Sequence, residues 1–246
     1  MIDLTSVRIF AGLEKQEANA ILAAAAKRKF KASETIIRAE GKATHLIMVR
    51  KGFVDFFVLT EKGQDVLVRR FVPGDTFGIA SLLHEPLGYL GTATAVSDVE
   101  VLAWDQRDAA RMAHAYPRFS QNAFRLALRY IAIYAHRHTS LVFDTAQERL
   151  AYALTSTASR AGATLPTGVE ISIRNEDLAS LADVSLFTAC RLMKKWERAG
   201  AVEKSRGKVL IRCPERLLAE EMPGSEAGPG RRDKPKSQKR KRKRKS

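Results

Sequence analysis

The chain has 246 residues and a net charge of +15, from 42 Lys and Arg against 27 Asp and Glu, so it is strongly basic and long enough for two domains. Its two cysteines, Cys190 and Cys213, have no paired spacing, which argues against a disulfide framework, a zinc site and a cysteine-ligated iron–sulfur cluster. It has no long apolar run, so we expect no signal peptide, no membrane contact and a cytoplasmic location.

The first half of the chain has the pattern of a β domain. Glycines recur every eleven residues, at Gly41, Gly52, Gly63 and Gly74. Short apolar runs at 46–49, 53–59, 66–72, 93–96 and 99–104 predict strands, and an Ala-rich helix is expected before them at 15–26. Regular short strands separated by glycine turns are typical of an antiparallel jelly roll. We therefore expect a β domain over residues 1–115.

A long helix is predicted over residues 116–142, and it has two apolar faces. One is a seam with 4-3-4-3 spacing, formed by Phe119, Ala123, Leu126, Tyr130 and Ile133. The other is a stripe formed by Phe124, Leu128, Ile131 and Ala135. Two apolar faces need two partners, so we assign one to the β domain and the other to the same helix of a second subunit, with the 4-3-4-3 seam as the dimer face. A core helix of a monomer is the alternative.

Residues 171–200 predict two short helices joined by a tight turn, after a further helix at 145–160. The first has Asn175 as its N-cap and ends near Asp183, and Ser185 caps the second. In the second helix an apolar stripe recurs at i, i+3, i+4 and i+7, formed by Ala189, Leu192, Met193 and Trp196. Residues 201–212 then read as strand, basic turn and strand. We expect a winged helix-turn-helix over residues 143–222, and an α+β protein as a whole.

A helix-turn-helix places its second helix in the major groove of DNA. A basic face that begins at a helix N-terminus suits phosphates and base edges. The residues expected to contact DNA are Arg174, Asn175, Ser185, Leu186, Phe187, Thr188, Arg191, Lys194, Lys195, Lys204, Arg206 and Lys208. An ordinary helical hairpin with a solvated basic face is the alternative, and Cys190 is interpreted as part of a packed helix flank rather than a redox switch.

The last segment, residues 223–246, holds eleven Lys and Arg against two acidic residues and almost no apolar side chain. Such a composition predicts a disordered basic tail. Two roles stay open for it, a solubilising tail and a tether that binds DNA without sequence preference.

The order of jelly roll, long helix and winged helix resembles the cyclic-AMP receptor protein and fumarate–nitrate regulator (CRP/FNR) family of bacterial transcription factors, over roughly residues 8–218. The stretches that carry the resemblance are Glu40-Gly41, Val49-Arg50-Lys51-Gly52, Pro73-Gly74-Asp75-Thr76-Phe77-Gly78, and Leu178-Ala179 through Ser185, Thr188 and Arg191-Leu192. The resemblance implies a cyclic-nucleotide-binding-like β domain and a homodimeric regulator that binds a palindromic site on double-stranded DNA and works with RNA polymerase. It implies no catalytic residue and no metal site.

Members of the family that bind cyclic nucleotides use a Glu for the ribose and an Arg for the phosphate. Here those positions fall on Ile79 and on Tyr89 or Leu90, and the adenine contact falls on Tyr134 and Ala135. We therefore expect no ordinary binding of cyclic AMP. The corresponding pocket consists of Gly78, Ile79, Ala80, Ser81, Tyr89, Leu90, Gly91, Thr92 and Tyr134, and its effector is left open.

Other branches of the family use an iron–sulfur cluster or haem. The cysteine cluster of its oxygen-sensing branch is missing, so an iron–sulfur cluster is not expected. Haem stays open, and the candidate ligands are His45, His84, His114, His136 and His138.

The second helix of the motif also departs from the family. Where well-known members present an Arg and a Glu after the cap, this chain has Leu186 and Phe187, and only Arg191 matches. We therefore expect a different DNA site. Two other functions stay open: a signal-independent architectural DNA-binding protein, and a cupin-type metalloenzyme. The second needs a cluster of metal ligands that His45 and His84 alone do not make.

Overall fold

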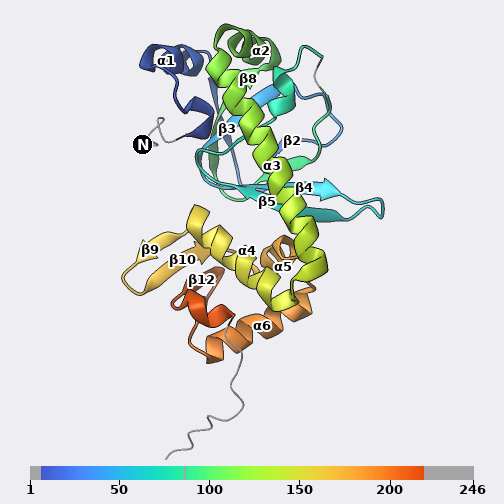
Figure 1. Cartoon of the computed structure of the whole chain (residues 1–246), viewed down its shortest axis with the longest axis vertical. Helices are drawn as coiled ribbons and strands as arrows, with labels where there is room; N and C mark the ends of the chain where they lie inside the picture. The colour runs from blue at the N-terminus through green and yellow to red at the C-terminus, as the bar shows by residue number, and fades with distance from the viewer. Residues whose placement is uncertain (1–6, 86, 219–246) are drawn as a thin grey trace, which may run out of the picture.

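The structure is a computed structural model that describes residues 7–85 and 87–218, and it confirms the α+β architecture (Figure 1). A β domain lies at one end, a long helix runs down from it, and a smaller mixed domain lies at the other end. The predicted tail at 223–246 lies outside the described residues. In the part of the chain that is described, no helix is both long and apolar enough to cross a membrane.

The β domain is a jelly roll of two four-stranded antiparallel sheets. Its strands are β1 (Ala26–Phe30), β2 (Thr35–Ile37), β3 (His45–Lys51), β4 (Val54–Leu59), β5 (Asp65–Phe71), β6 (Thr76–Phe77), β7 (Thr92–Ala95) and β8 (Val99–Asp105). The sheets have the orders β1-β8-β3-β6 and β2-β7-β4-β5. Gly52 has a φ of +82°, and a Cβ there would lie 2.5 Å from the carbonyl oxygen of Asp98, so the turn requires glycine.

Helices cover one end of the roll. They are the 3₁₀ helix η2 (Arg8–Phe10), α1 (Lys15–Ala23), the 3₁₀ helix η3 (Ile79–Leu82), α2 (Gln106–Ala115) and the long helix α3 (Pro117–Phe143). The fully buried Trp104 of β8 donates a hydrogen bond from Nε1 to the carbonyl oxygen of Ile21 at 2.7 Å, which holds α1 against the sheet.

The structure corrects the dimer face predicted on α3. Phe119, Ala123 and Leu126 are buried in the core that α3 shares with the β domain of its own chain. Tyr130, from the same seam, donates a hydrogen bond to the carbonyl oxygen of Thr76 at 2.6 Å. The prediction that this seam meets a second subunit is therefore wrong, because the chain's own β domain occupies it. Ile133, its last member, is half-buried and lines a cavity towards the C-terminal domain.

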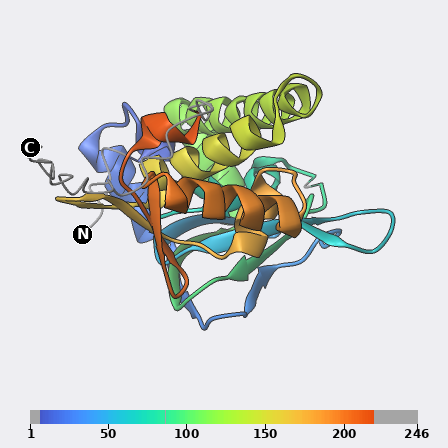
Figure 2. The same cartoon turned by 90° about the horizontal axis from the view of Figure 1, so that it is seen from below.

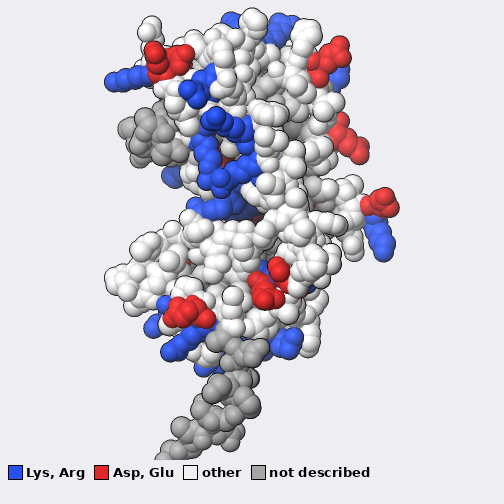
Figure 3. All heavy atoms as spheres, viewed as in Figure 1, with Lys and Arg blue, Asp and Glu red and all other residues white. Residues whose placement is uncertain are grey.

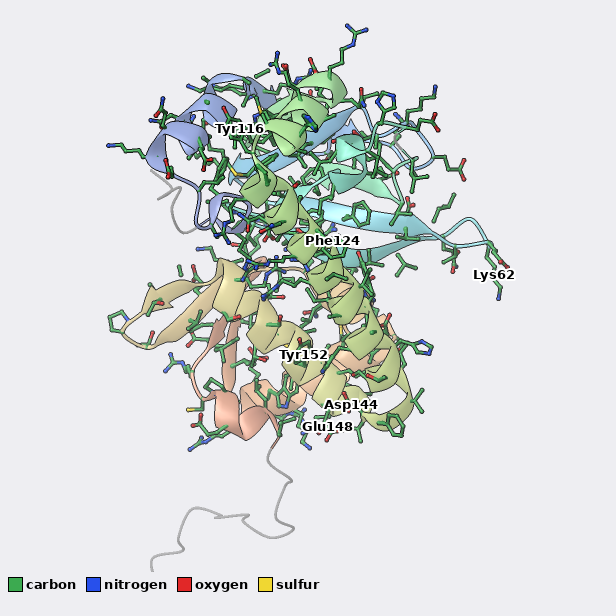
Figure 4. The ribbon with its side chains drawn as sticks, turned by 45° about the horizontal axis from the view of Figure 1, so that its top comes forward. Lys62, Tyr116, Phe124, Asp144, Glu148 and Tyr152 are labelled. Carbon is green, nitrogen blue, oxygen red and sulfur yellow. The ribbon has the colours of Figure 1, made fainter. Side chains whose placement is uncertain are left out.

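The other stripe of α3 is free in this chain. Phe124, labelled in Figure 4, is 64% exposed, Leu128 is 49% exposed and Ile131 is 63% exposed. The stripe continues through Ala135 to Val142, which is 68% exposed. An apolar row of this length on a helix surface is typical of a protein–protein contact.

The C-terminal domain is the predicted winged helix-turn-helix. Its elements are α4 (Ala146–Ala161), β9 (Ala163–Leu165), β10 (Gly168–Ser172), α5 (Asn175–Leu181), α6 (Leu186–Arg198), β11 (Val202–Ser205), β12 (Lys208–Ile211) and the 3₁₀ helix η4 (Pro214–Leu217). Its sheet has the order β11-β12-β10-β9. Thr145 and Glu148 form a capping box at the start of α4. The N-cap of α5 is Arg174, so the predicted cap at Asn175 is one residue late.

Arginines join the two domains through buried and partly buried ion pairs. Arg70 of β5 holds both carboxylate oxygens of Asp55, at 2.6 and 2.7 Å, and reaches Asp177 of α5 at 3.1 Å. Arg137 of α3 donates hydrogen bonds from Nε and Nη2 to the two carboxylate oxygens of Asp183, in the turn between α5 and α6, at 2.5 and 2.6 Å. These contacts fix the orientation of the helix-turn-helix relative to the β domain.

Burial and neighbouring charges shift the pKa values of several groups at this junction. Burial raises the pKa of Asp55, although the hydrogen bond from Arg70 opposes the rise. Burial alone would also raise the pKa of Asp177, but Arg174 and Arg70 outweigh it and leave that pKa below its usual value. Burial raises the pKa of Tyr130 to about 12. The arginines thus oppose the effect of burial on the pKa of both carboxylates.

Candidate nucleic-acid interface

Helix α6 lies across the lower end of the molecule, on the side away from the β domain (Figures 1 and 2). Ser185 caps it, as predicted, because its Oγ accepts a hydrogen bond from the backbone N–H of Thr188 at 3.1 Å. The predicted apolar stripe of Ala189, Leu192, Met193 and Trp196 is buried against α4 and α5. Trp196 also donates from Nε1 to the carbonyl oxygen of Leu217 at 2.9 Å. The stripe thus fixes which face of α6 points outwards.

The outward face of α6 is basic. Phe187, which is 78% exposed, is followed at spacings of four, three and four by Arg191, Lys194 and Arg198, all exposed. In residues 7–85 and 87–218 none of these three cations forms an ion pair, so their charge stays available. Arg198 is not among the residues that the sequence predicts as DNA contacts, although its spacing of seven from Arg191 places it on the same face.

Three residues of α6 that were predicted to contact DNA are partly buried or hydrogen-bonded within the protein. Thr188 shares a hydrogen bond of 2.9 Å with the Ser185 hydroxyl. Lys195 is half-buried and donates from Nζ to Gln147 Oε1 of α4 at 3.4 Å. Leu186 is 44% exposed and lies at the edge of the buried stripe. These residues support the helix more than they extend its outward face.

The wing carries fewer available charges than its sequence suggests. Strands β11 and β12 pair from Val202 with Ile211 to Ser205 with Lys208. Lys208 forms an ion pair of 2.7 Å with Glu170 of β10, which offsets its charge. Arg206, at the exposed tip, and Lys204, half-buried on β11, have no ion pair among the residues that the structure describes.

Two predicted contacts, Arg174 and Asn175, lie at the start of α5 rather than on α6. Arg174 pairs with Asp177 at 2.9 Å and lines a cavity shared with Ser33 and Thr94 of the β domain, so it faces the domain junction. Its side chain is 70% exposed, and its role as a DNA contact stays a prediction. Asn175 donates from Nδ2 to Cys190 Sγ at 3.2 Å, which places Cys190 in a packed position.

The predicted effector pocket is closely packed. Tyr89 Oη accepts a hydrogen bond from His45 N at 3.0 Å and donates to His45 O at 3.2 Å. A Cβ on Gly78 would lie 2.3 Å from the same carbonyl oxygen, and one on Gly91 would lie 2.3 Å from the carbonyl oxygen of Phe57. Leu90 is 85% exposed and points away. Of the two positions expected for a phosphate-binding arginine, one thus holds a tyrosine that is hydrogen-bonded to the protein itself and the other holds an exposed leucine.

Aromatic side chains fill the interior of the roll beside this site. The rings of Phe71 and Phe77 stack at 4.7 Å, and Tyr130 lies 6.1 Å from Phe71. Tyr89 borders a small cavity of about 220 Å³ together with Arg28 and His45. Within the described ranges there is no group of three or more His, Cys, Asp or Glu arranged to hold a metal ion.

Comparison with known proteins gives two matching family models. The model described as "Cyclic nucleotide-binding domain" matches residues 27–116, and the model described as "Crp-like helix-turn-helix domain" matches residues 148–220. The cyclic AMP receptor protein of Thermus thermophilus is 28% identical over 214 residues, covering 87% of this chain and 95% of that protein. The cAMP-activated global transcriptional regulator CRP of Pasteurella multocida is 25% identical over 186 residues, covering 74% and 88%.

Solved structures show the same fold. The catabolite activator protein of Thermus thermophilus matches with a TM-score of 0.51 at 28% identity, covering 85% of this chain and 96% of that one. FixK2 of Bradyrhizobium japonicum has a TM-score of 0.69 at 18% identity, covering 78% and 95%. The regulator CLP of Xanthomonas campestris, described as responsive to c-di-GMP, has a TM-score of 0.68 at 16% identity, covering 80% and 99%.

Proposed function

Because the chain belongs to the CRP/FNR family of transcriptional regulators, we propose that it binds a palindromic DNA site as a homodimer and that cyclic AMP is not its effector. The observation that carries the DNA-binding proposal is the outward row of Phe187, Arg191, Lys194 and Arg198 on α6. We also propose that the protein acts in the cytoplasm and contacts RNA polymerase, as a bacterial transcriptional regulator does.

Each residue of the row has a chemical role in this proposal. Arg191 lies one turn into α6, where its guanidinium can donate two parallel hydrogen bonds to guanine O6 and N7. Phe187 offers an apolar surface to a thymine methyl group. Lys194, Arg198 and, on the wing, Arg206 bind phosphates and fix the register of α6 along the groove. Two copies of α6 in a symmetric dimer would enter successive major grooves about 34 Å apart.

Replacing Arg191 with alanine should weaken binding to the preferred site by about 1–3 kcal/mol and relax the preference at one base pair in each half-site. The preferred site is first obtained by selection from a random DNA pool, and the affinity of each variant is then measured on that site and on single-base changes of it. Lys194→Ala, on the same face, should weaken binding equally on all of these sequences. An equal loss for Arg191→Ala on every sequence would contradict its role in reading a base.

Dimerisation is supported by the exposed stripe of α3. Phe124, Leu128, Ile131 and Ala135 have 4-3-4 spacing and Val142 lies seven residues after Ala135, which is the pattern by which two helices pack along a seam. Since the β domain already occupies the opposite seam, the stripe needs a partner from another chain. A second copy is the occupant that places two α6 helices around a two-fold axis.

The loss of the cyclic AMP response is supported by the residues that replace the nucleotide ligands. The relatives from Thermus thermophilus and Pasteurella multocida are named for cyclic AMP. Here the Ile79 side chain cannot accept a hydrogen bond from ribose, and the Tyr89 hydroxyl offers no guanidinium and is hydrogen-bonded to the backbone of His45. A buried phosphate without a cation would lose its hydration without compensation.

Isothermal titration with cyclic AMP should therefore give no saturable heat at micromolar concentrations. Titration of the same protein with its selected DNA site is the control that shows the preparation to be active. Stoichiometric micromolar binding of cyclic AMP would overturn this part of the proposal. An architectural DNA-binding protein remains the second candidate, and a footprint without discrete half-sites would favour it.

A further inference from the structure

A cavity of about 410 Å³ lies between the two domains, in the angle between β5, α3 and α4. Seven of its lining residues are arginines, and the only carboxylate in the described lining is Asp183. Figure 3 shows this basic patch as a hollow at the waist of the molecule, beside the long helix. The cavity is separate from the predicted effector pocket of the β domain and from the outward face of α6.

The arginines exceed the carboxylates that pair with them. Asp55 and Asp177 pair with Arg70, Asp75 pairs with Arg69 and Arg160, and Asp183 pairs with Arg137. Seven arginines against these four carboxylates leave an excess of three positive charges around one cavity. Like charges that converge in a partly enclosed space repel one another, and an anion that enters the space relieves this repulsion.

Three arginines of the lining have no carboxylate partner in residues 7–85 and 87–218. They are Arg8 of η2, Arg129 of α3 and Arg149 of α4. Arg149 donates only to backbone carbonyls, at 2.7 Å to Asp144 and 3.1 Å to Ala182. These three come from separate elements, so the excess charge surrounds the cavity rather than lying on one side of it.

Arg69 gives a second, independent observation. It lines the cavity, it is only 6% exposed, and its Nε has no hydrogen-bond partner among the described residues. Its guanidinium lies 4.6 Å from the ring centre of Tyr130 and 5.3 Å from that of Phe71, so the group is held in place. A buried N–H of a charged group normally has an acceptor, so the guanidinium of Arg69 is incompletely satisfied by the protein and adds a fixed positive charge to the lining.

The lining also offers an aromatic surface. His136 of α3 and Tyr152 of α4 stack with their ring centres 5.1 Å apart and an interplanar angle of 29°. Tyr152, labelled in Figure 4, is 56% exposed, so one side of the stack remains available. Arginines beside an exposed aromatic ring can bind phosphates and a nucleobase together. The volume lies in the range of ordinary small-molecule sites.

We propose that this cavity binds a nucleotide that carries two or more phosphate groups. The phosphates lie against Arg129, Arg149 and Arg69, and the base lies on the ring of Tyr152. An excess of three positive charges matches a multiply charged anion better than a singly charged cyclic monophosphate. On α3, Arg129, Ile133 and His136 point away from the exposed stripe at Phe124 and Ile131, so the proposed dimer leaves the cavity open.

The test measures binding of three probes to the full chain by calorimetry: GTP, inorganic tripolyphosphate and guanosine. GTP should bind with one site per chain, tripolyphosphate about tenfold more weakly, and guanosine without measurable heat. Arg129→Gln should lower GTP affinity about tenfold, because one charge-assisted contact is lost. Arg125→Gln is the matched control, because Arg125 is an exposed arginine on the same helix that does not line the cavity.

Tyr152→Leu tests the place of the base. It should reduce GTP binding to the level of tripolyphosphate and leave tripolyphosphate binding unchanged. The proposal fails if GTP does not bind, or if Arg125→Gln and Arg129→Gln lose affinity equally. It also fails if Arg191→Gln abolishes the binding, because the anion then lies on the face of α6. DNA selection with the wild-type protein tests the proposed function separately.

Discussion

Replacing Ile131 with glutamate should convert the full-length protein from a dimer to a folded monomer and abolish its binding to a palindromic DNA site. Ile131 is 63% exposed in the single chain, so the substitution disturbs no intrachain core. In the proposed dimer, the two-fold axis brings the two glutamates together inside an apolar seam, where unpaired charges are costly. We expect the dissociation constant of the dimer to rise at least about 100-fold, or about 3 kcal/mol. Sedimentation velocity over a concentration series measures it.

Ala132→Glu is the matched control, with the same new side chain at the next position. Ala132 is exposed and points about 100° away from Ile131, and the flanking positions of a coiled coil tolerate glutamate. This variant should remain dimeric and bind DNA normally. A dimeric Ile131→Glu protein, or a wild type that is monomeric at micromolar concentration, would show that the stripe is not the dimer face.

The two faces of α3 show a limit of prediction from periodicity. Both apolar rows have 4-3 spacing, so the pattern predicts two partners without saying which partner takes which row. The choice depends on contacts that are distant in sequence. Asn122, on the buried side, donates from Nδ2 to the carbonyl oxygens of Ile9 and Ala11 at 3.0 and 2.8 Å. A polar residue beside the seam is a signal that was available in the sequence, but it indicates a partner only once the fold is known.

Predictions from short-range sequence patterns agreed with the structure better than predictions of contacts between distant residues. The Ser185 cap and the apolar stripe of α6 act within a few residues, and the structure has both. Strand β1 was missed because its sequence, Ala-Lys-Arg-Lys-Phe, is charged and mostly exposed. The ion pair between Arg70 and Asp177 joins residues 107 positions apart, so no local sequence pattern predicts it. The cap and the apolar stripe that orient α6 were therefore predictable, whereas the domain junction and its basic cavity were not.

Replacing Arg70 with methionine should lower the free energy of unfolding by about 3–5 kcal/mol. Arg70 is 5% exposed, and its removal leaves Asp55 buried without its arginine and takes from Asp177 its partner in the β domain. Chemical denaturation followed by tryptophan fluorescence measures the loss. Arg111→Met is the control, because it removes an exposed pair with Asp108 at 2.5 Å on α2. That change should stay within about 0.5 kcal/mol, and a similar loss in both variants would contradict the special role of Arg70.

The same denaturation experiment can show whether the ion pairs of Arg70 stabilise the folded protein or only orient the helix-turn-helix relative to the β domain. Trp104 lies buried in the β domain and Trp196 lies buried in the C-terminal domain, so single-tryptophan backgrounds report each domain. In Arg70→Met the two unfolding transitions should move apart, because the contact that couples the domains is gone. A triple variant that also converts Asp55 and Asp177 to leucine should recover most of the lost free energy, since it leaves no unpaired buried charge. If the transitions stay apart in that stable triple variant, the ion pairs serve to orient the helix-turn-helix rather than to hold the protein folded.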